Sequence, residues 1–262
     1  MRTASLLRTI AQIAAVLFVF ALFASGSPLA EAAEIKVLTS VALTPTFDEL
    51  APQFEKASGN KLAIGYALIA EVRKRMLAGE SADVVILSRP VMEELEKAGK
   101  LASDGIVDVA GTEVGIAARA GAQKPDIGTV EALKRTLLAA KSISYADPAK
   151  GGASGVYFAQ VLERLGIAAE MKPKTVLVPG PQAGEAVAKG EAELGVAQVS
   201  ELVTVPGTEL VGTLPGEYAR VTMFSAALGA GSKVAEEAKA FIRFLTEPTA
   251  AAVFKAKGFK SG

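Results

Sequence analysis

Apolar and polar positions follow one another along this chain in a pattern that predicts strands alternating with helices. Apolar runs such as Glu34 to Thr39 and Ala82 to Leu87 have the length of buried strands, and turn residues follow each run. From Phe47 to Ala57, apolar residues recur at helical spacing. Such alternation is typical of an α/β protein with a mostly parallel sheet and right-handed crossovers.

The same pattern extends to the end of the chain. We expect strands at 34–39, 61–67, 82–87, 106–117 (one or two strands), 142–145, 175–178, 194–199, 210–214 and 218–228. We expect helices after Thr44, at 71–78, 91–98 and 130–139, after the Gly-rich loop up to Leu165, at 183–189, from Ser200, and at 234–245 and 249–257. Thr44, Thr129 and Ser154 are the expected N-caps, and Gly59 the expected end of the first helix.

The segment from Ile143 to Leu165 combines a strand, a Gly-rich loop and an amphipathic helix. Gly151, Gly152 and Gly155 allow the backbone to approach a neighbour closely. The start of the following helix carries unpaired N–H groups and partial positive charge, which suits an anion. The segment is therefore either an anion-binding loop or a tight turn without a ligand.

Composition narrows the function. The 28 basic and 28 acidic residues balance, which does not favour a nucleic-acid partner. The chain has no Cys and no His, so thiol chemistry, disulfides and imidazole ligands or bases are excluded. We therefore expect no enzyme, no metal site and no cofactor. The alternative, a hydrolase using Ser40 or Ser154 with Lys150 as base, lacks a nucleophile-elbow motif.

The N-terminus predicts export. Arg2 and Arg8 precede an apolar stretch from Ile10 to Ala24, and the small residues Ala30 and Ala32 fit a cleavage site. A membrane anchor is the alternative, but about 15 apolar residues fall short of the ~20 needed to span a bilayer. Residues 1–33 are therefore interpreted as a signal peptide, removed from a soluble mature chain.

Several segments taken together resemble a known family. VLTSVAL with TPTFDELAPQFEKASGNKL, then GESADVVIL, YADPAKGGASG and the closing FIRFLTEPTAAAVFKAKGF resemble periplasmic solute-binding proteins of ABC importers, especially the molybdate-binding branch. The resemblance covers nearly all of residues 34–262. It implies a two-lobed type 2 periplasmic-binding-protein fold, each lobe a mixed, mostly parallel sheet flanked by helices. It also implies that residues 34–116 and 222–262 form lobe 1, that residues 117–221 form lobe 2, and that the crossovers act as hinges.

The resemblance implies a ligand site in the cleft, with two departures from the molybdate pattern. Ser40 matches the first hydroxyl of that pattern, but Leu68, Ile69 and Ala70 stand where the second is expected, and Gln198 replaces a Tyr. Molybdate-like oxyanions and organic anions both remain open as ligands. The predicted ligand-binding residues are Thr39, Ser40, Leu68, Ile69, Ala70, Ser88, Arg89, Arg119, Ala153, Ser154, Gly155, Pro181, Gln182, Gln198 and Ser200. For Arg89 and Arg119, the alternative is a solvated surface position.

These inferences combine into one expected function. The mature chain is expected to be a periplasmic monomer that captures a small anion between its lobes and delivers it to an ABC permease. A ligand-binding partner of a periplasmic sensor is the alternative that the sequence leaves open.

Overall fold

The computed structural model describes residues 32–103 and 105–261. The predicted signal peptide, residues 1–33, therefore lies outside the described residues except for Ala32 and Ala33. No helix within the described ranges is long and apolar enough to cross a membrane.

The described strands join in one sheet with the order β2-β1-β3-β9-β4-β7-β5-β6, and β8 and β10 also pair with β4. They are β1 Glu34–Ser40, β2 Lys61–Ala67, β3 Val84–Ser88, β4 Val107–Arg119, β5 Ile143–Ala146, β6 Thr175–Val178, β7 Leu194–Gln198, β8 Thr208–Thr213, β9 Val221–Leu228 and β10 Lys260–Ser261. β1 is parallel to β2 and β3, and β5 is parallel to β6 and β7, as the strand–helix alternation predicts.

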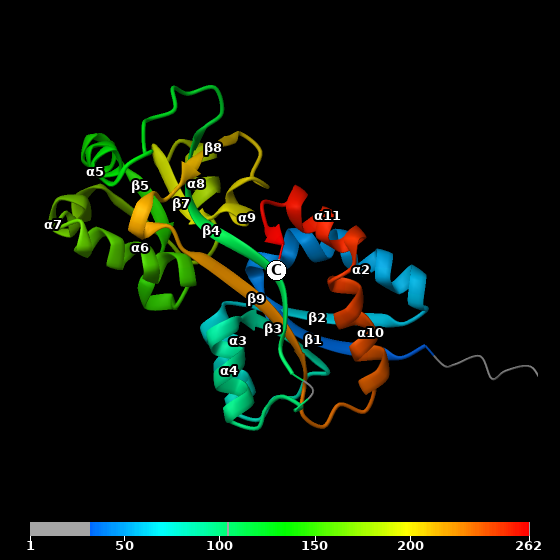
Figure 1. Cartoon of the computed structure of the whole chain (residues 1–262). Helices are drawn as coiled ribbons and strands as arrows, with labels where there is room; N and C mark the ends of the chain where they lie inside the picture. Colours follow the sequence, from blue (N-terminus) through cyan, green and yellow to red (C-terminus); the bar gives the residue numbers. More distant parts are fainter. Residues whose placement is uncertain (1–31, 104, 262) are drawn as a thin grey trace, which may run out of the picture. The chain divides into compact units, whose positions relative to one another are not determined.

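Two antiparallel strands, β4 and β9, connect the parallel groups (Figure 1). The first part of β4, up to Glu113, pairs with β9, and the part from Val114 pairs with β7 and β8. β4 is a single strand of 13 residues. From the sequence, with Gly111 and Gly115 inside the apolar run, either one strand or two was expected here. A Cβ at Gly111 would lie 2.7 Å from the side chain of Val221, so this glycine permits close packing and does not end the strand.

Helices flank both parallel groups. They are α2 Thr44–Ser58, α3 Ile69–Leu77, α4 Arg89–Lys97, α5 Val130–Ala139, α6 Ala153–Arg164, α7 Ala168–Met171, α8 Ala183–Lys189, α9 Val199–Leu202, α10 Ala235–Leu245 and α11 Pro248–Ala256. The short 3₁₀ turns are η1 Val41–Leu43, η2 Pro148–Lys150, η3 Lys172–Lys174 and η4 Gly216–Tyr218.

The buried apolar residues form separate clusters on the two parallel groups. The first cluster surrounds β1 and β3 and includes Phe241, whose ring contacts those of Phe47 and Phe54. The second surrounds β5 and includes Tyr145 and Phe158, and a smaller cluster lies beneath α8. Each group of strands therefore has its own hydrophobic support.

Two of the predicted N-caps are wrong. The turn η1 precedes α2, so Leu43 is the N-cap and Thr44 is the first helical residue. Likewise α6 begins at Ala153 after the N-cap Gly152, which places Ser154 inside the first turn. In both places helical backbone already precedes the hydroxyl residue that was expected to be the N-cap. The cap at Thr129 is confirmed, since its side chain accepts a hydrogen bond from the Ala132 amide, and Gly59 ends α2 with a φ of 78°.

Candidate functional site

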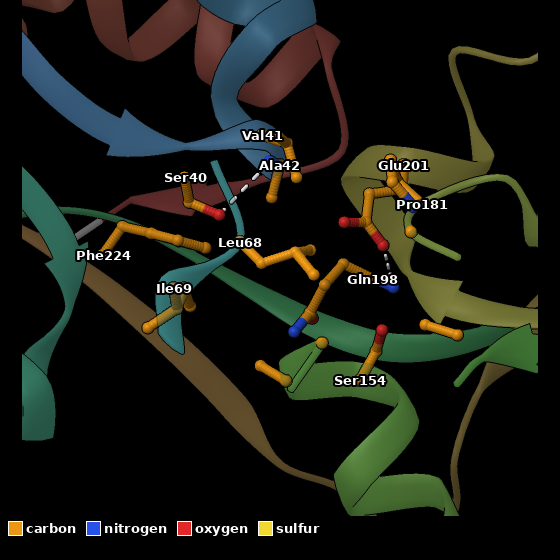
Figure 2. A pocket seen from close by; sticks show the side chains of 14 residues that line it. Ser40, Val41, Ala42, Leu68, Ile69, Ser154, Pro181, Gln198, Glu201 and Phe224 are labelled. Carbon is orange, nitrogen blue, oxygen red and sulfur yellow. Dashed lines mark hydrogen bonds between the residues drawn. The ribbon is translucent and has the colours of Figure 1, made fainter. Parts of the chain in front are cut away.

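A small space lies where strand ends and helix starts from both parallel groups meet, and we call it the cleft pocket (Figure 2). Its volume is about 20 Å³, which is room for a water molecule. Its lining residues are Ser40, Val41, Ala42, Leu68, Ile69, Ala146, Gly152, Ala153, Ser154, Gly180, Pro181, Gln198, Glu201 and Phe224.

Two helices begin at the cleft pocket without a side-chain cap. The N-caps of α3 and α6 are Leu68 and Gly152, and neither makes a side-chain hydrogen bond to its helix. Neither residue has a side-chain oxygen, so the N–H groups of these first turns gain no acceptor from the cap. Two helix starts with partial positive charge are thus available to an anionic group.

Two hydroxyl groups add donors to the same space. Ser40 ends β1, and its Oγ accepts a hydrogen bond of 3.3 Å from the Ala42 amide, which leaves its own hydrogen free to donate elsewhere. Figure 2 shows the hydroxyl of Ser154 directed from α6 into the space. The next residue, Gly155, lets α6 approach β5 closely, because a Cβ there would lie 2.0 Å from the carbonyl oxygen of Ala146.

Gln198 and Glu201 form the wall contributed by β7 and α9. The Nε2 of Gln198 donates to the Oγ1 of Thr222 at 3.1 Å, which ties the end of β7 to the crossover strand β9. The Oε2 of Glu201 accepts a hydrogen bond of 3.1 Å from the backbone amide of Gln198. Burial raises the pKa of Glu201 to about 7; that hydrogen bond lowers it, and the carboxylate of Glu185 raises it.

The rest of the lining is apolar. Leu68, Ile69, Pro181 and Phe224 contribute carbon surface, and no Lys or Arg is among the lining residues that the structure describes. Backbone amides and hydroxyls on some walls, with apolar groups on others, suit a ligand that has both polar ends and a carbon skeleton.

A larger space of about 680 Å³ adjoins the cleft pocket and shares Ile69 and Ala153 with it; we call it the adjoining cavity. Three arginines line it. The guanidinium of Arg73 pairs with Glu94, and that of Arg89 with Glu93 and Asp108. The guanidinium of Arg220 lies 5.1 Å from the centre of the Tyr157 ring, and no carboxylate of the described residues pairs with it. Arg220 is therefore the lining arginine whose charge is least compensated.

The predicted site residues fall into three groups. Seven line the cleft pocket: Ser40, Leu68, Ile69, Ala153, Ser154, Pro181 and Gln198. Three more line only the adjoining cavity: Ala70, Ser88 and Arg89. The others lie outside both linings: Thr39, Gly155, Gln182, Ser200 and Arg119.

The residues outside the linings have other contacts. The Thr39 hydroxyl donates to the Ile86 carbonyl at 3.0 Å, and the Ser200 amide donates to Thr112. Gln182 is the N-cap of α8. Arg119 lines a different cavity of about 520 Å³ and donates to the Ala188 carbonyl.

Sequence reasoning missed Glu201 and Arg220. Glu201 lies three residues after the end of β7, in the first turn of α9. Arg220 directly precedes the crossover strand β9. Acidic and basic residues directly at the ends of such elements were the available signal. Lys150, the base that a serine hydrolase would need, does not line the cleft pocket. In the described ranges, no cluster of three acidic side chains is arranged to hold a metal ion.

Comparisons with known proteins agree on the fold. A family profile described as bacterial extracellular solute-binding protein matches residues 35–260. An aconitate isomerase from Pseudomonas sp. is 35% identical over 249 residues, covering 92% of this chain and 94% of that protein. The molybdate-binding protein ModA of Escherichia coli is 28% identical over 241 residues, covering 90% and 92%.

A solved structure shows the architecture directly. The periplasmic molybdate-binding protein of Azotobacter vinelandii superposes with a TM-score of 0.70 at 21% identity, covering 87% of this chain and 99% of that one. The expected two-lobed type 2 fold and the resemblance to molybdate-binding proteins are therefore confirmed.

Proposed function

This chain belongs to the bacterial extracellular solute-binding protein family, and from that premise we propose that it captures a small organic polycarboxylate in the cleft pocket. The observation that carries the proposal is the lining itself. Uncapped helix starts and the hydroxyls of Ser40 and Ser154 face the same space as the carbon surface of Leu68 and Phe224. A carboxylate finds donors there, and a carbon skeleton finds an apolar wall.

A molybdate-like oxyanion fits this lining less well. A tetrahedral dianion has oxygens in every direction, and each needs a donor when it is buried. Leu68 stands where the resemblance to molybdate binders implies a hydroxyl, so an oxygen facing Leu68 has no side-chain donor. An organic acid instead directs a methylene group toward this side chain.

The adjoining cavity supplies room and charge for a second carboxylate. It shares Ile69 and Ala153 with the cleft pocket, and Arg220 on its wall has a guanidinium without a carboxylate partner among the described residues. Guanidinium groups bind carboxylates through paired N–H bonds. A ligand with two or three carboxylates thus places one at the helix starts and another toward Arg220. The relative named aconitate isomerase supports this class, because aconitate is a tricarboxylate on a short carbon skeleton.

Binding requires the two lobes to move. A pocket of about 20 Å³ does not hold a tricarboxylate, so the ligand enters when the lobes separate. We propose that residues 34–116 with 222–262 form one lobe and residues 117–221 the other, and that β4 and β9 bend between them. Residues 1–33 direct export to the periplasm, where a monomer delivers its ligand to an ABC permease.

Thermal unfolding with a panel of anions tests the proposal. We expect tricarboxylates such as cis-aconitate, trans-aconitate and citrate to raise the melting temperature. A ligand at 100 times its Kd adds about 2.7 kcal/mol, which for a chain of this size is about 5–11 °C. Molybdate and sulfate are expected to give little shift. Tight molybdate binding with no response to any carboxylate contradicts the proposal.

A pair of serine variants localises the ligand. Ser154→Ala removes one donor of the cleft pocket, and we expect an affinity loss of about 3- to 10-fold from a hydrogen bond worth about 1 kcal/mol. Ser58→Ala, at the end of α2 and outside the pocket lining, is the matched control and should bind as the wild type does. Equal affinities of both variants contradict this location of the site.

A second candidate function is isomerisation of the bound ligand. It is favoured by the relative named aconitate isomerase and by Glu201, a carboxyl in the cleft pocket with a pKa of about 7. Moving a double bond along a tricarboxylate needs a group that takes a proton from a methylene carbon and returns it to the former alkene carbon. Glu201 is the lining residue able to do so.

Proton NMR of cis- and trans-aconitate incubated with the protein tests this candidate. Interconversion that Glu201→Gln abolishes, with binding retained, supports it. Binding without interconversion rejects the isomerase and leaves the binding proposal in place.

A further inference from the structure

Glu201 is unusual for a residue in an anion-binding pocket. Of the described residues that line the cleft pocket, it alone is ionisable, and it has the same sign of charge as the proposed ligand. One of its oxygens is held in place by the Gln198 amide. Figure 2 shows the other oxygen directed across the space toward Ala42 and Leu68. A ligand entering the pocket meets this second oxygen.

In the part of the chain that the structure describes, no cation pairs with Glu201. The carboxylate of Glu185 on α8 raises the pKa of Glu201 by charge repulsion. The Oε2 of Glu185 is itself buried without a hydrogen-bond partner among the described residues. The elements that pack against α9 are β4, β7, β8, α8 and η1, and β7 and η1 carry no charged residue. The other charged residues on these elements are Asp108, Glu113, Arg119, Lys189 and Glu209.

Most of these groups are engaged elsewhere. Asp108 pairs with Arg89, Glu113 with Lys260 and Glu209 with Lys124, while Arg119 donates to a carbonyl beside a different cavity. Lys257, next to the Gly258 that packs on α9, pairs with Glu49. No ion pair within the described residues involves Glu201 or Lys189, and a ligand carboxylate placed beside Glu201 adds a second negative charge.

Two carboxyl groups that share one partly buried space cannot both stay ionised at low cost, and they accommodate each other by sharing a proton. We infer that Glu201 binds the ligand while it is itself in the neutral carboxylic acid form. In that form it donates its proton in a hydrogen bond to a ligand carboxylate. The proton comes from solvent, stays on the Glu201–ligand pair while the ligand is bound, and returns to solvent on release. This inference rests on the proposed binding of a polycarboxylate.

The ionisation of Glu201 in the free protein supports the same conclusion. Burial raises its pKa to about 7, so in the free protein the neutral form is already far more accessible than for an exposed glutamate. An anion beside it raises the pKa further, because a like charge disfavours the ionised form. Binding above neutral pH therefore takes up close to one proton per ligand.

Calorimetric titration with tricarballylate tests the inference, since this saturated tricarboxylate has no double bond to move. Across about pH 7.5–9, where the ligand's own carboxyl groups stay ionised, we expect the wild-type affinity to fall by up to about tenfold per pH unit. In buffers of different ionisation enthalpy, the observed heat should change in proportion to an uptake of about one proton. This readout needs no variant.

Variants assign the proton. Glu201→Gln keeps an oxygen for the Gln198 amide and a neutral donor for the ligand, so it should bind with little dependence on pH. Glu185→Gln removes the charge that raises the pKa of Glu201, so the fall in affinity should begin at lower pH. Glu209→Gln, on β8 and paired with Lys124, is the matched control and should keep the wild-type profile.

The outcomes separate the inference from the function beneath it. Carboxylate binding with no proton uptake and a flat pH profile overturns the role of Glu201 and leaves the proposed function intact. The role of Glu201 is also overturned if the affinity of Glu201→Gln falls with pH as steeply as that of the wild type. Absence of carboxylate binding at every pH instead removes the proposed function, and the inference with it.

Discussion

Replacement of Gly155 by Ala should displace the start of α6 from β5 and thereby weaken both the fold and the site. A Cβ at this position would lie 2.0 Å from the carbonyl oxygen of Ala146 and 2.8 Å from its carbonyl carbon. Both contacts are with backbone, so no side-chain rotation relieves them. The helix start has to move away from β5 by at least about 1.4 Å to bring the 2.0 Å approach to an ordinary contact of about 3.4 Å.

The magnitude follows from two opposing effects. Overpacking of a well-packed site costs about 1–3 kcal/mol, and a fixed backbone obstacle favours the upper end. Ala is a better helix former than Gly by about 1 kcal/mol, which offsets part of the cost. A net loss of about 2 kcal/mol corresponds to a melting temperature lower by about 4–8 °C for a chain of this size. Because Ala153 and Ser154 move with the helix, polycarboxylate affinity should fall as well.

Thermal unfolding and calorimetric titration measure both effects. Gly180→Ala is the stability control, since the nearest atom to its new Cβ would be the Gln182 Oε1 at 3.8 Å and the methyl group has room. The reasoning is refuted if Gly155→Ala melts within about 1 °C of the wild type, because the clash would then cost almost nothing.

Three further changes address other parts of the structure. Glu201 has a pKa of about 7 in the folded chain against 4.5 as its ordinary value, so its contribution to stability is present below pH 4.5 and is lost as pH rises through 7. The free energy of unfolding should therefore fall by up to about 3 kcal/mol as the pH rises. Urea unfolding at pH 5 and pH 8 should show this fall for the wild type and a smaller one for Glu201→Gln. The same fall in both proteins contradicts the assignment to Glu201. Tyr157→Phe removes a 2.9 Å hydrogen bond to the Tyr218 carbonyl and should cost about 1–2 kcal/mol by the same assay, where a neutral result contradicts the importance of that bond. Phe241→Ala empties a fully buried site among aromatic rings and should cost about 3–5 kcal/mol in denaturant unfolding, whereas a loss below about 1 kcal/mol means that the core collapses around the gap.

Part of the site was predictable because of where strands end. Ser40, Ser154 and Gln198 each follow or begin an element whose apolar pattern is evident, and the carboxyl ends of parallel strands are where ligands bind in such folds. All three line the cleft pocket. Arg119 was proposed because it lies just past the first predicted crossover, but β4 continues as one strand beyond the part that lines the adjoining cavity. Arg119 stands five residues beyond Val114, which is about 17 Å along an extended chain.

Local sequence determined the order of strands and helices, the parallel pairing within each group and the glycine at the helix start near Ala146. These features depend on side-chain periodicity and on backbone conformations that only certain residues adopt, so neighbours along the chain are sufficient to specify them. The tertiary structure decided which helix starts remain uncapped, which arginine lacks an acidic partner, and that Glu201 faces the ligand space. Those properties depend on how residues far apart in sequence come together, such as Glu201 and Ser40, which line the same pocket. Burial in that pocket raises the pKa of Glu201.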